Sequence, residues 1–388
     1  MGTPNPSTVG ILPVGALGVA FYHHLTGGAH ERDPGVTFLS RRGGSGGERW
    51  REGSSLGIET ATQARGVPLS GRLAGTLPSA AARGALPDIV LVCTNPDQLF
   101  DVVSDYVAVV EHEHRCGRLL PGEARLPCLV LCANGIYFQR IRSSFIELLE
   151  EATLLGRLPD LWPDLMPAVV GRLMRGVTLQ TGLRRGSGEA ALYRPGPPGR
   201  TQLTGGDRRA RSAAAAHLKG RGAWFEDAAE VPPTRVEFNK ALVNLAINVF
   251  GQLEAIGPDG RFRVLTVGQI GAPSQHARIF GLVEAVVNVG RGVGVYRAEE
   301  TPQAIFEETL TWMLPAAEHV PSSLQWLEQQ ISAGTLTPGL TPTEKWLLQP
   351  LQHFARSLGD PRAIQYFEGL EGQLTEAIGR AMALQRGP

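Results

Sequence analysis

Lysine is scarce in this chain: of 37 strongly basic residues only Lys219, Lys240 and Lys345 are lysines, and all the others are arginines. Arginine cannot release its proton near neutral pH, whereas a lysine can be tuned to do so by its surroundings. Each of the three positions therefore raises the question of why arginine does not serve there. The scarcity makes any lysine within a motif a candidate for proton transfer.

Cysteine is also sparse, and its spacing excludes two kinds of site. The four cysteines form no C-x-x-C pair, and no histidine lies at ligand spacing from them. In so long a chain this pattern does not indicate a disulfide framework or a zinc site. We expect a protein of the reducing cytoplasm without a metal centre.

An excess of either charge and long apolar runs are both missing. Acidic and basic residues balance at 37 each, whereas nucleic-acid and membrane-surface partners favour a basic excess. No apolar run approaches the length of a membrane span, and Met1–Ser7 lacks the pattern of a signal peptide. These observations predict neither a nucleic-acid nor a membrane partner.

The chain has 388 residues, which favours two domains, and its first part alternates short apolar runs with helical segments. Continuous apolar strands separated by helices predict a parallel sheet covered on both faces. The fold class expected is therefore α/β, a Rossmann-type doubly wound sheet followed by an all-helical domain. The strands expected are Thr8–Leu12, Val36–Ser40, Asp88–Cys93 and Pro127–Cys132, with further short pieces between residues 186 and 206.

From about Asp207 onward long helical segments replace this alternation, so we place the domains at residues 1–206 and 207–388. The second domain shows no strong alternating strand and is expected to be mostly α. The helices expected are 208–221, 235–253, 277–290, 301–312 and 349–358, and Gly43–Gly57 and Arg115–Arg125 are expected to be loops.

A turn of small residues follows the first strand. Gly15, Ala16, Leu17 and Gly18 lead into an apolar helix, as in a dinucleotide fingerprint. Gly15 would let the backbone approach a pyrophosphate, and Gly18 would let the helix pack close to the sheet, with the helix N–H groups facing the phosphates. Pro13 replaces the first glycine of that fingerprint. A tight strand–helix turn without a ligand is the alternative.

The end of the second strand indicates which nucleotide would bind. Enzymes that use NAD usually carry an acidic residue there for the ribose hydroxyls, but this chain has Ser40, Arg41 and Arg42. A hydroxyl and a guanidinium suit a 2′-phosphate. The sequence therefore predicts NADPH as the cofactor, with a solvated arginine pair as the alternative.

A polar stripe lies within an apolar helical segment: Lys240, Asn244 and Asn248 stand four residues apart. On an α-helix these positions share nearly one face. Because buried polar groups must find partners, the stripe either bonds neighbouring backbone or lines a cavity. In the second case a lysine, whose pKa burial lowers toward the working range, can donate a proton to the alkoxide that hydride delivery to a ketone creates.

These motifs together resemble the ketopantoate reductase (2-dehydropantoate 2-reductase) family of the 6-phosphogluconate dehydrogenase-like group. The resemblance covers nearly the whole chain in the right order, and it implies loop insertions near residues 43–57, 115–127, 254–275 and 331–340. One motif is the K-x-x-x-N-x-x-x-N helix that begins at Lys240. The others are short segments, each with the residues that match the family: Cys132-Ala-Asn-Gly-Ile (Asn134 and Gly135), Pro321-Ser-Ser-Leu-Gln (Ser322) and Thr341-Pro-Thr-Glu (Glu344).

The resemblance implies reduction of 2-dehydropantoate to pantoate with NADPH, in a Rossmann domain joined to a helical one. It implies Lys240 as the general acid, with Glu344 setting the state of Lys240 or contacting the cofactor. The implied substrate-binding residues are Asn244, Asn248, Ser322 and Asn134. The implied cofactor-binding residues are Gly15, Ala16, Leu17, Gly18, Ser40, Arg41, Asn95, Asn134 and Glu344.

Three departures keep other functions open. Pro13 is one, Asn95 stands where the family has a lysine near the cofactor, and Trp326 replaces an aspartate. One alternative is a β-hydroxyacid or opine-type dehydrogenase with another substrate; another is a non-catalytic nucleotide-binding relative. The apolar helical domain is compatible with a homodimer.

Overall fold

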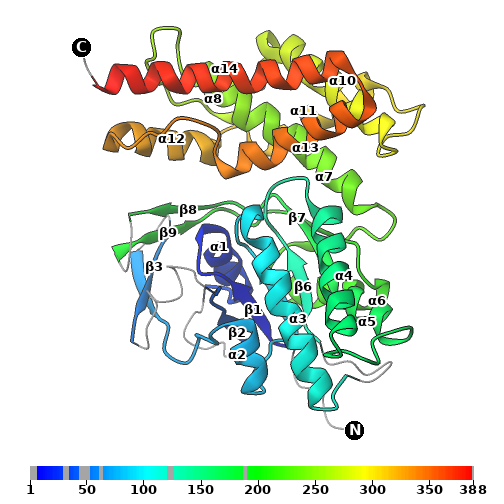
Figure 1. Ribbon diagram of the computed structural model, residues 1–388. Helices are drawn as coiled ribbons and strands as arrows, with labels where there is room; N and C mark the ends of the chain where they lie inside the picture. The colour runs from blue at the N-terminus through cyan, green and yellow to red at the C-terminus, as the bar shows by residue number, and fades with distance from the viewer. Residues whose placement is uncertain are drawn as a thin grey trace. The chain divides into compact units, whose positions relative to one another are not determined.

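The computed structural model describes residues 7–28, 35–42, 53–60, 64–119, 126–186 and 190–386. The chain forms two compact units (Figure 1). The first unit comprises Met1–Ala133 and Phe138–Pro233, and the second comprises Asn134–Tyr137 and Thr234–Pro388. Within the expected loops 43–57 and 115–127, residues 43–52 and 120–125 fall outside the described residues.

A seven-stranded sheet in the order β11-β10-β7-β6-β5-β1-β2 forms the centre of the first unit. The five strands from β7 to β2 pair in parallel, β10 is antiparallel to β7, and β11 is parallel to β10. The predicted doubly wound parallel sheet is thus confirmed. The strands are β1 (Val9–Leu12), β2 (Val36–Phe38), β5 (Ile89–Val92), β6 (Cys128–Leu131), β7 (Leu173–Thr178), β10 (Thr201–Thr204) and β11 (Phe225–Asp227).

Burial explains why these segments become strands. All residues of β1, β5, β6 and β7 are buried, as expected for strands covered by helices on both faces. Figure 1 shows α3 and α4 packed side by side in this unit. The helices are α1 (Ala16–Leu25), α2 (Leu77–Ala82), α3 (Leu99–Arg115), α4 (Phe138–Leu154), α5 (Leu165–Val170) and α6 (Arg208–Gly220), with the 3-10 turn η1 (Pro96–Gln98) before α3.

A second, four-stranded sheet in the order β4-β3-β9-β8 packs against α1. The backbone of Gly182 lies so close to Ala16 that a Cβ there would meet the Ala16 carbonyl oxygen. Residues 55–57 lie in β3, so this part of the expected loop 43–57 was wrong. The strands are β3 (Ser55–Glu59), β4 (Ala64–Pro68), β8 (Gly182–Arg185) and β9 (Leu192–Pro195).

The boundary between the units lies at Pro233 and not at residue 206. The reason is β11, which pairs with β10 from Thr201↔Phe225 to Leu203↔Asp227 and contacts α6. The chain from 207 to 233 therefore completes the first unit. The three-residue strand β11 is too short to show a period in the sequence.

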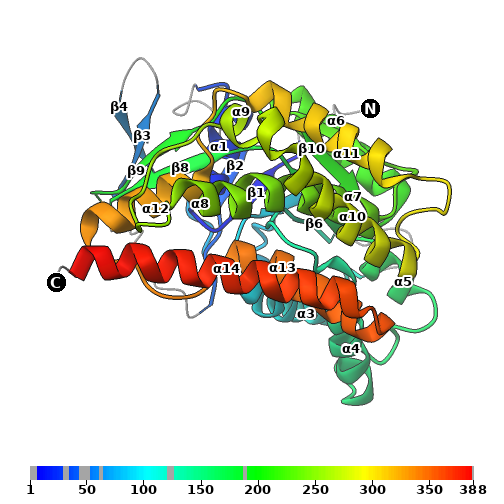
Figure 2. The same cartoon turned by 90° about the horizontal axis from the view of Figure 1, so that it is seen from above.

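The second unit is all-helical, as predicted, with the apolar faces of its helices forming one core. Val286, Leu351 and Phe367 are fully buried in that core, and α14 packs along α13 (Figure 2). The helices are α7 (Pro233–Asn244), α8 (Phe250–Ala255), α9 (Val267–Ile270), α10 (His276–Gly292), α11 (Pro302–Met313), α12 (Ser322–Ala333), α13 (Pro342–Leu358) and α14 (Pro361–Arg386).

Two of the expected helix boundaries change. The segment expected as one helix over 235–253 contains a π-helical turn at Leu245–Val249 between α7 and α8. The helix expected at 349–358 is the second half of α13. The expected loop 254–275 contains the short helix α9, and α12 extends into the expected loop 331–340 as far as Ala333.

No helix within the described residues is long and apolar enough to cross a membrane.

Candidate functional site

The turn between β1 and α1 leaves open space at Gly15 and packs closely at Gly18. Gly15 is the N-cap of α1, with an extended backbone, and a Cβ added to it would meet nothing within 4 Å. A Cβ on Gly18 would stand 2.6 Å from the Pro13 carbonyl oxygen and 2.8 Å from Ile11. The predicted close packing of the helix at Gly18 is therefore confirmed. Ala16 and Leu17, in the first turn, are half-buried.

The sheet topology places this turn at a switch point. The chain passes from β1 to β2 on one side and later returns to β5 on the other side of β1. Ligands of open α/β sheets bind at the carboxyl ends of the strands beside such a reversal. Asn95 lies there as well: it follows β5, is exposed and is the N-cap of η1. The open backbone at Gly15 and the helix N-terminus together suit a pyrophosphate.

Both arginines after β2 are already paired with carboxylates of α3. Arg41 Nη1 lies 3.1 Å from Asp101 Oδ2, and Arg42 Nε lies 2.9 Å from Asp105 Oδ1. Burial raises the pKa of Asp105, and Arg42 opposes that shift. The preceding Ser40 donates its backbone N–H to Gly75 O at 2.8 Å. A 2′-phosphate would compete with Asp101 for the Arg41 guanidinium, a competition that the local sequence does not reveal.

The end of β6 leads into the segment that begins with Asn134. On the sheet side, buried Arg175 donates hydrogen bonds to the carbonyl oxygens of Leu131 and Ala133 at 2.7 and 2.9 Å. Asn134 itself is exposed. Gly135 has a φ of +134°, and an added Cβ would stand 3.0 Å from Trp346. Glycine is therefore required here by both conformation and space.

The next two residues attach this segment to the helices of the second unit. Ile136 donates its N–H to Trp346 O on α13 at 3.1 Å, and Tyr137 donates its N–H to Glu237 Oε1 on α7 at 3.2 Å. Glu237 is buried, one turn before Lys240. The backbone that follows Asn134 is thus bonded to the two helices that carry Lys240 and Glu344.

The π-helical turn aligns the polar stripe. In an α-helix residue i+4 overshoots one full turn by about 40°, so a long i, i+4 series drifts around the helix. A π turn closes at i+5 and is wider, so residue i+4 falls short of a full turn. The step from Lys240 to Asn244 is α-helical and the next step crosses the π turn at Leu245–Val249. The wider turn therefore brings Asn248 back toward the line of Lys240.

The stripe ends inside the second unit. Lys240 is half-buried, whereas Asn244 and Asn248 are buried. Among the described residues, the Asn244 Nδ2 atom is buried without a hydrogen-bond partner. Asn248 Oδ1 accepts from the Ser323 hydroxyl of α12 at 3.0 Å. Asn248 is thus held in place, while the Asn244 amide has a donor that is not used by these residues.

The hydroxyl that contacts Asn248 belongs to Ser323 and not to Ser322. Ser322 is the first residue of α12 and is exposed, and the following residue turns by about 100° around the helix toward Asn248. Sequence reasoning missed Ser323 because Ser322 alone matches the family segment. Ser322 stays a prediction.

Gln252 extends the stripe by one more step of four residues and was also missed. Its side chain is 1% exposed, and Nε2 donates to Glu344 Oε1 at 3.1 Å. Glu344 lies in the first turn of α13 and is likewise 1% exposed. The four-residue period from Lys240 onward was the available signal for Gln252. The helical unit therefore brings the stripe and Glu344 together through Gln252.

Glu344 is an ionisable group in an unfavourable place for charge. Burial raises its pKa to about 7, against the opposing effects of the backbone N–H groups of Glu344 and Thr341 and the amide of Gln252. Among the described residues no ion pair to Glu344 is found. A carboxyl with this pKa exchanges its proton near neutral pH.

We predict that this carboxyl makes stability depend on pH. The folded protein binds the Glu344 proton up to about pH 7, whereas the unfolded chain releases it near 4.5. The associated stabilisation is complete below pH 4.5 and is lost as pH rises through 7, a change of about 3 kcal/mol. Urea unfolding at pH 5 and pH 8 measures it. Glu344→Gln should remove this component, and an unchanged pH dependence in that variant would contradict the assignment.

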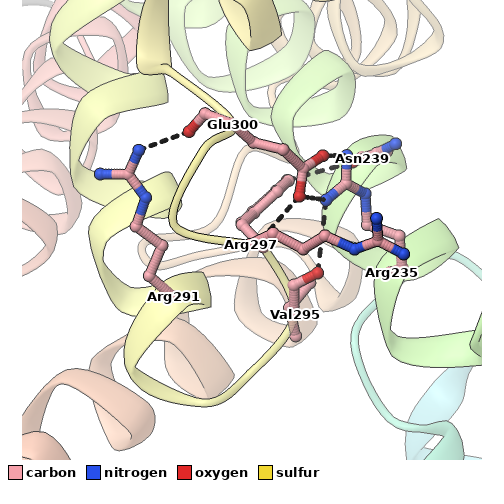
Figure 3. Close-up of polar contacts among 7 residues, drawn as sticks. Arg235, Asn239, Arg291, Val295, Arg297 and Glu300 are labelled. Carbon is pink, nitrogen blue, oxygen red and sulfur yellow. Dashed lines mark hydrogen bonds and ion pairs between the residues drawn. The ribbon is translucent and has the colours of Figure 1, made fainter.

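The N-terminal half of α7 is fixed by a polar cluster around Glu300 (Figure 3). Arg235 donates two hydrogen bonds to the Glu300 carboxylate, at 2.9 and 2.5 Å, and its guanidinium lies 4.2 Å from the ring centre of Tyr296. Tyr296 in turn donates its hydroxyl to Asn239 at 3.1 Å. Asn239 precedes Lys240, so the cluster fixes the helix that carries the lysine.

The predicted residues therefore fall into two groups. The first unit holds seven of them, all near the carboxyl ends of its strands: Gly15, Ala16, Leu17, Gly18, Ser40, Arg41 and Asn95. The second unit holds the others: Asn134, Lys240, Asn244, Asn248, Ser322 and Glu344. In the described residues no three His, Cys, Asp or Glu side chains are placed to hold a metal ion.

No protein-family model matches the chain, and no curated protein matches its sequence. Its fold is similar to that of solved dehydrogenases. A D-mandelate dehydrogenase with NADH and anilino(oxo)acetate has a TM-score of 0.64 at 15% identity, over 96% of this chain and 99% of that one. A dimeric ketopantoate reductase from Staphylococcus aureus has a TM-score of 0.57 at 13% identity, over 95% of this chain and 99% of that one.

An octopine dehydrogenase in complex with NADH and agmatine has a TM-score of 0.54 at 11% identity, over 96% of this chain and 90% of that one. At these identities the likeness establishes the fold: a Rossmann-type sheet followed by a helical domain, over nearly the full length of the chain.

Proposed function

We propose that the protein is an NADPH-dependent reductase of small 2-oxo acids, with 2-dehydropantoate as the favoured substrate. The observation that carries the proposal is the line of Lys240, Asn244 and Asn248, which the π turn straightens, together with the Asn244 Nδ2 donor, which has no partner among the described residues. A switch-point turn with an open glycine supports the nucleotide. The shared fold with a ketopantoate reductase and a D-mandelate dehydrogenase supports the reaction class.

The residues of the chain divide the work of such a reaction. When bound, the nicotinamide would supply the hydride. Lys240 would donate a proton to the oxygen of the reduced carbonyl, because a lysine can release a proton where arginine cannot. Asn244 Nδ2 would donate a hydrogen bond to the substrate. Asn248 is held by Ser323 through its Oδ1 atom, and its Nδ2 group would be a second donor.

Residues of the first unit would hold the nucleotide. The N–H groups at the start of α1 would bind the pyrophosphate over Gly15, Ala16 and Leu17. Ser40 and Arg41 would contact the adenosine ribose or its phosphate, and Asn95 would lie toward the nicotinamide. From the second unit, Asn134 is proposed for the same part of the cofactor. Ser322 is proposed for the substrate, Glu344 for setting the protonation of the site, and a homodimer for the assembly.

A second candidate is an NADH-dependent 2-hydroxyacid or opine-type dehydrogenase. The observation that favours it is the Asp101 carboxylate, 3.1 Å from Arg41, because it neutralises the guanidinium that would bind a 2′-phosphate. The similar D-mandelate and octopine dehydrogenases both contain NADH. The two candidates differ in cofactor and in substrate, and each difference can be measured.

Nucleotide binding separates the candidates. Because a ligand that binds only the folded state raises the melting temperature, NADPH should raise it more than NADH does. Arg41→Ala should weaken NADPH binding about tenfold and leave NADH nearly unchanged, whereas Arg115→Ala on the far end of α3 serves as the control. Equal losses for both nucleotides would assign the second candidate. No shift with either nucleotide would favour a non-catalytic relative.

A further inference from the structure

Among the described residues, three buried polar atoms of the stripe and of Glu344 beside it lack a hydrogen-bond partner: Asn244 Nδ2, Gln252 Oε1 and Glu344 Oε2. The first is a donor on the predicted substrate side of the stripe. The other two belong to one pair, because Gln252 Nε2 already donates to Glu344 Oε1. A buried polar atom without a partner costs about 1–3 kcal/mol, so two in one contact call for an explanation.

The chemistry of Gln252 and Glu344 explains the two unpartnered oxygens. An amide and a carboxyl are planar groups, each with two neighbouring heteroatoms, and here one hydrogen bond of 3.1 Å already joins them. The two atoms left over are both oxygens, and a carboxylate oxygen cannot bond to an amide oxygen because both only accept. A single proton on Glu344 Oε2 makes that oxygen a donor. The same proton then satisfies both unpartnered atoms.

We infer that Glu344 is held as the neutral acid by Gln252, with Oε2–H donating to Gln252 Oε1 and Gln252 Nε2 donating to Glu344 Oε1. Gln252 is then a positioning residue, which fixes the plane of the carboxyl and the site of its proton. The pair adds no negative charge at the inner end of the stripe. If the proposed function holds, an anionic 2-oxo acid can bind beside Lys240 without repulsion from Glu344.

The surroundings of Glu344 agree with this assignment. Its place in the first turn of α13 and the backbone N–H groups of Glu344 and Thr341 favour the carboxylate, yet burial outweighs them and raises the pKa to about 7. The π turn packed against α13 has no ionisable side chain. Charged groups of the described parts of α13 and its neighbouring helices, among them Lys345, Glu284 on α10 and Glu371 on α14, are not among the causes of the shift.

Infrared spectroscopy of the carboxyl group tests the inference without nucleotide or substrate. The wild type at pH 6 should show the C=O stretch of a buried protonated carboxyl, and Glu344→Gln should lack it. The band should disappear with a midpoint near pH 7. Gln252→Met keeps the size of the side chain but removes both hydrogen bonds, so the band should move to higher wavenumber.

The chain provides a matched control for that variant. Gln352 is a buried glutamine of α13 that donates to Glu371 at 2.6 Å, so Gln352→Met removes a similar amide–carboxyl contact elsewhere in the same unit. It should leave the Glu344 band unchanged. Circular dichroism verifies that each variant is folded; if Gln252→Met is not, Gln252→Asn, whose shorter side chain cannot reach, should give the same band shift.

Two results would overturn the inference. Absence of the band at pH 6 would mean that Glu344 is ionised and that the leftover oxygens are bridged by water. A band that does not move in Gln252→Met would mean that the acid donates to another group. Because these measurements need no turnover, their failure is distinct from a failure of the proposed reductase activity, and inactive but correctly titrating protein would reject only the latter.

Discussion

Lys240→Ala should lower kcat for 2-oxo acid reduction by about 10³-fold while leaving NADPH binding unchanged. The proton that completes an alcohol must come from a positioned acid, and such a group contributes about 10²–10⁴-fold to the rate. Lys240 lies at the outer end of the aligned stripe, on a helix fixed by Arg235 and Glu300. Nothing in the first unit should change, so the melting-temperature rise with NADPH should persist.

Two other lysine variants sharpen this result. Lys240→Arg keeps the positive charge but cannot release the proton near neutral pH, so it should be nearly as inactive as the alanine variant. Lys219→Ala removes an exposed lysine of the first unit and should keep wild-type turnover. Substantial turnover in Lys240→Arg would show that the site needs only the charge. Wild-type turnover in Lys240→Ala would remove lysine from the mechanism.

Gly18→Ala should destabilise the first unit by about 2 kcal/mol, the usual cost of forcing a methyl group into a packed core. The added Cβ would stand 2.6 Å from the backbone oxygen of Pro13, which cannot move without displacing the turn. The melting temperature without nucleotide should fall. NADPH affinity should fall with it, because the turn that would hold the pyrophosphate is displaced.

Gly15→Ala is the matched comparison, since the same methyl group enters open space and the extended backbone accepts alanine. We expect an unchanged melting temperature without nucleotide, but NADPH binding about tenfold weaker because the methyl occupies the approach of the pyrophosphate. If Gly15→Ala binds NADPH like the wild type, the phosphates do not lie over this turn. If Gly18→Ala is as stable as the wild type, the close packing is wrong.

The sequence predicted those parts of the fold that depend on local patterns. The apolar runs of β1, β5 and β6 indicated strands buried on both faces, because runs this short between turn signals are too short for a typical helix. The sheet of β3, β4, β8 and β9 was not predicted as such. β4 is mostly exposed and rich in polar and small residues, so its sequence looks like a loop.

The site shows the same division between local and distant information. The line from Lys240 to Asn248 follows from a four-residue period, and continuing that period would have identified Gln252. The π turn has no local signature in residues 245–249, which read as an ordinary apolar helix. The pairs Arg41–Asp101 and Gln252–Glu344 join residues 60 and 92 positions apart, and only the folded chain shows them.

The most direct test of 2-oxo acid reduction at the Lys240 stripe is NADPH oxidation by the purified protein with 2-dehydropantoate. The assay includes a panel of other 2-oxo acids and runs Lys240→Ala in parallel. We expect Lys240-dependent turnover with 2-dehydropantoate, or with one branched acid of the panel. Absence of turnover with every acid, or turnover that survives the loss of Lys240, would contradict it.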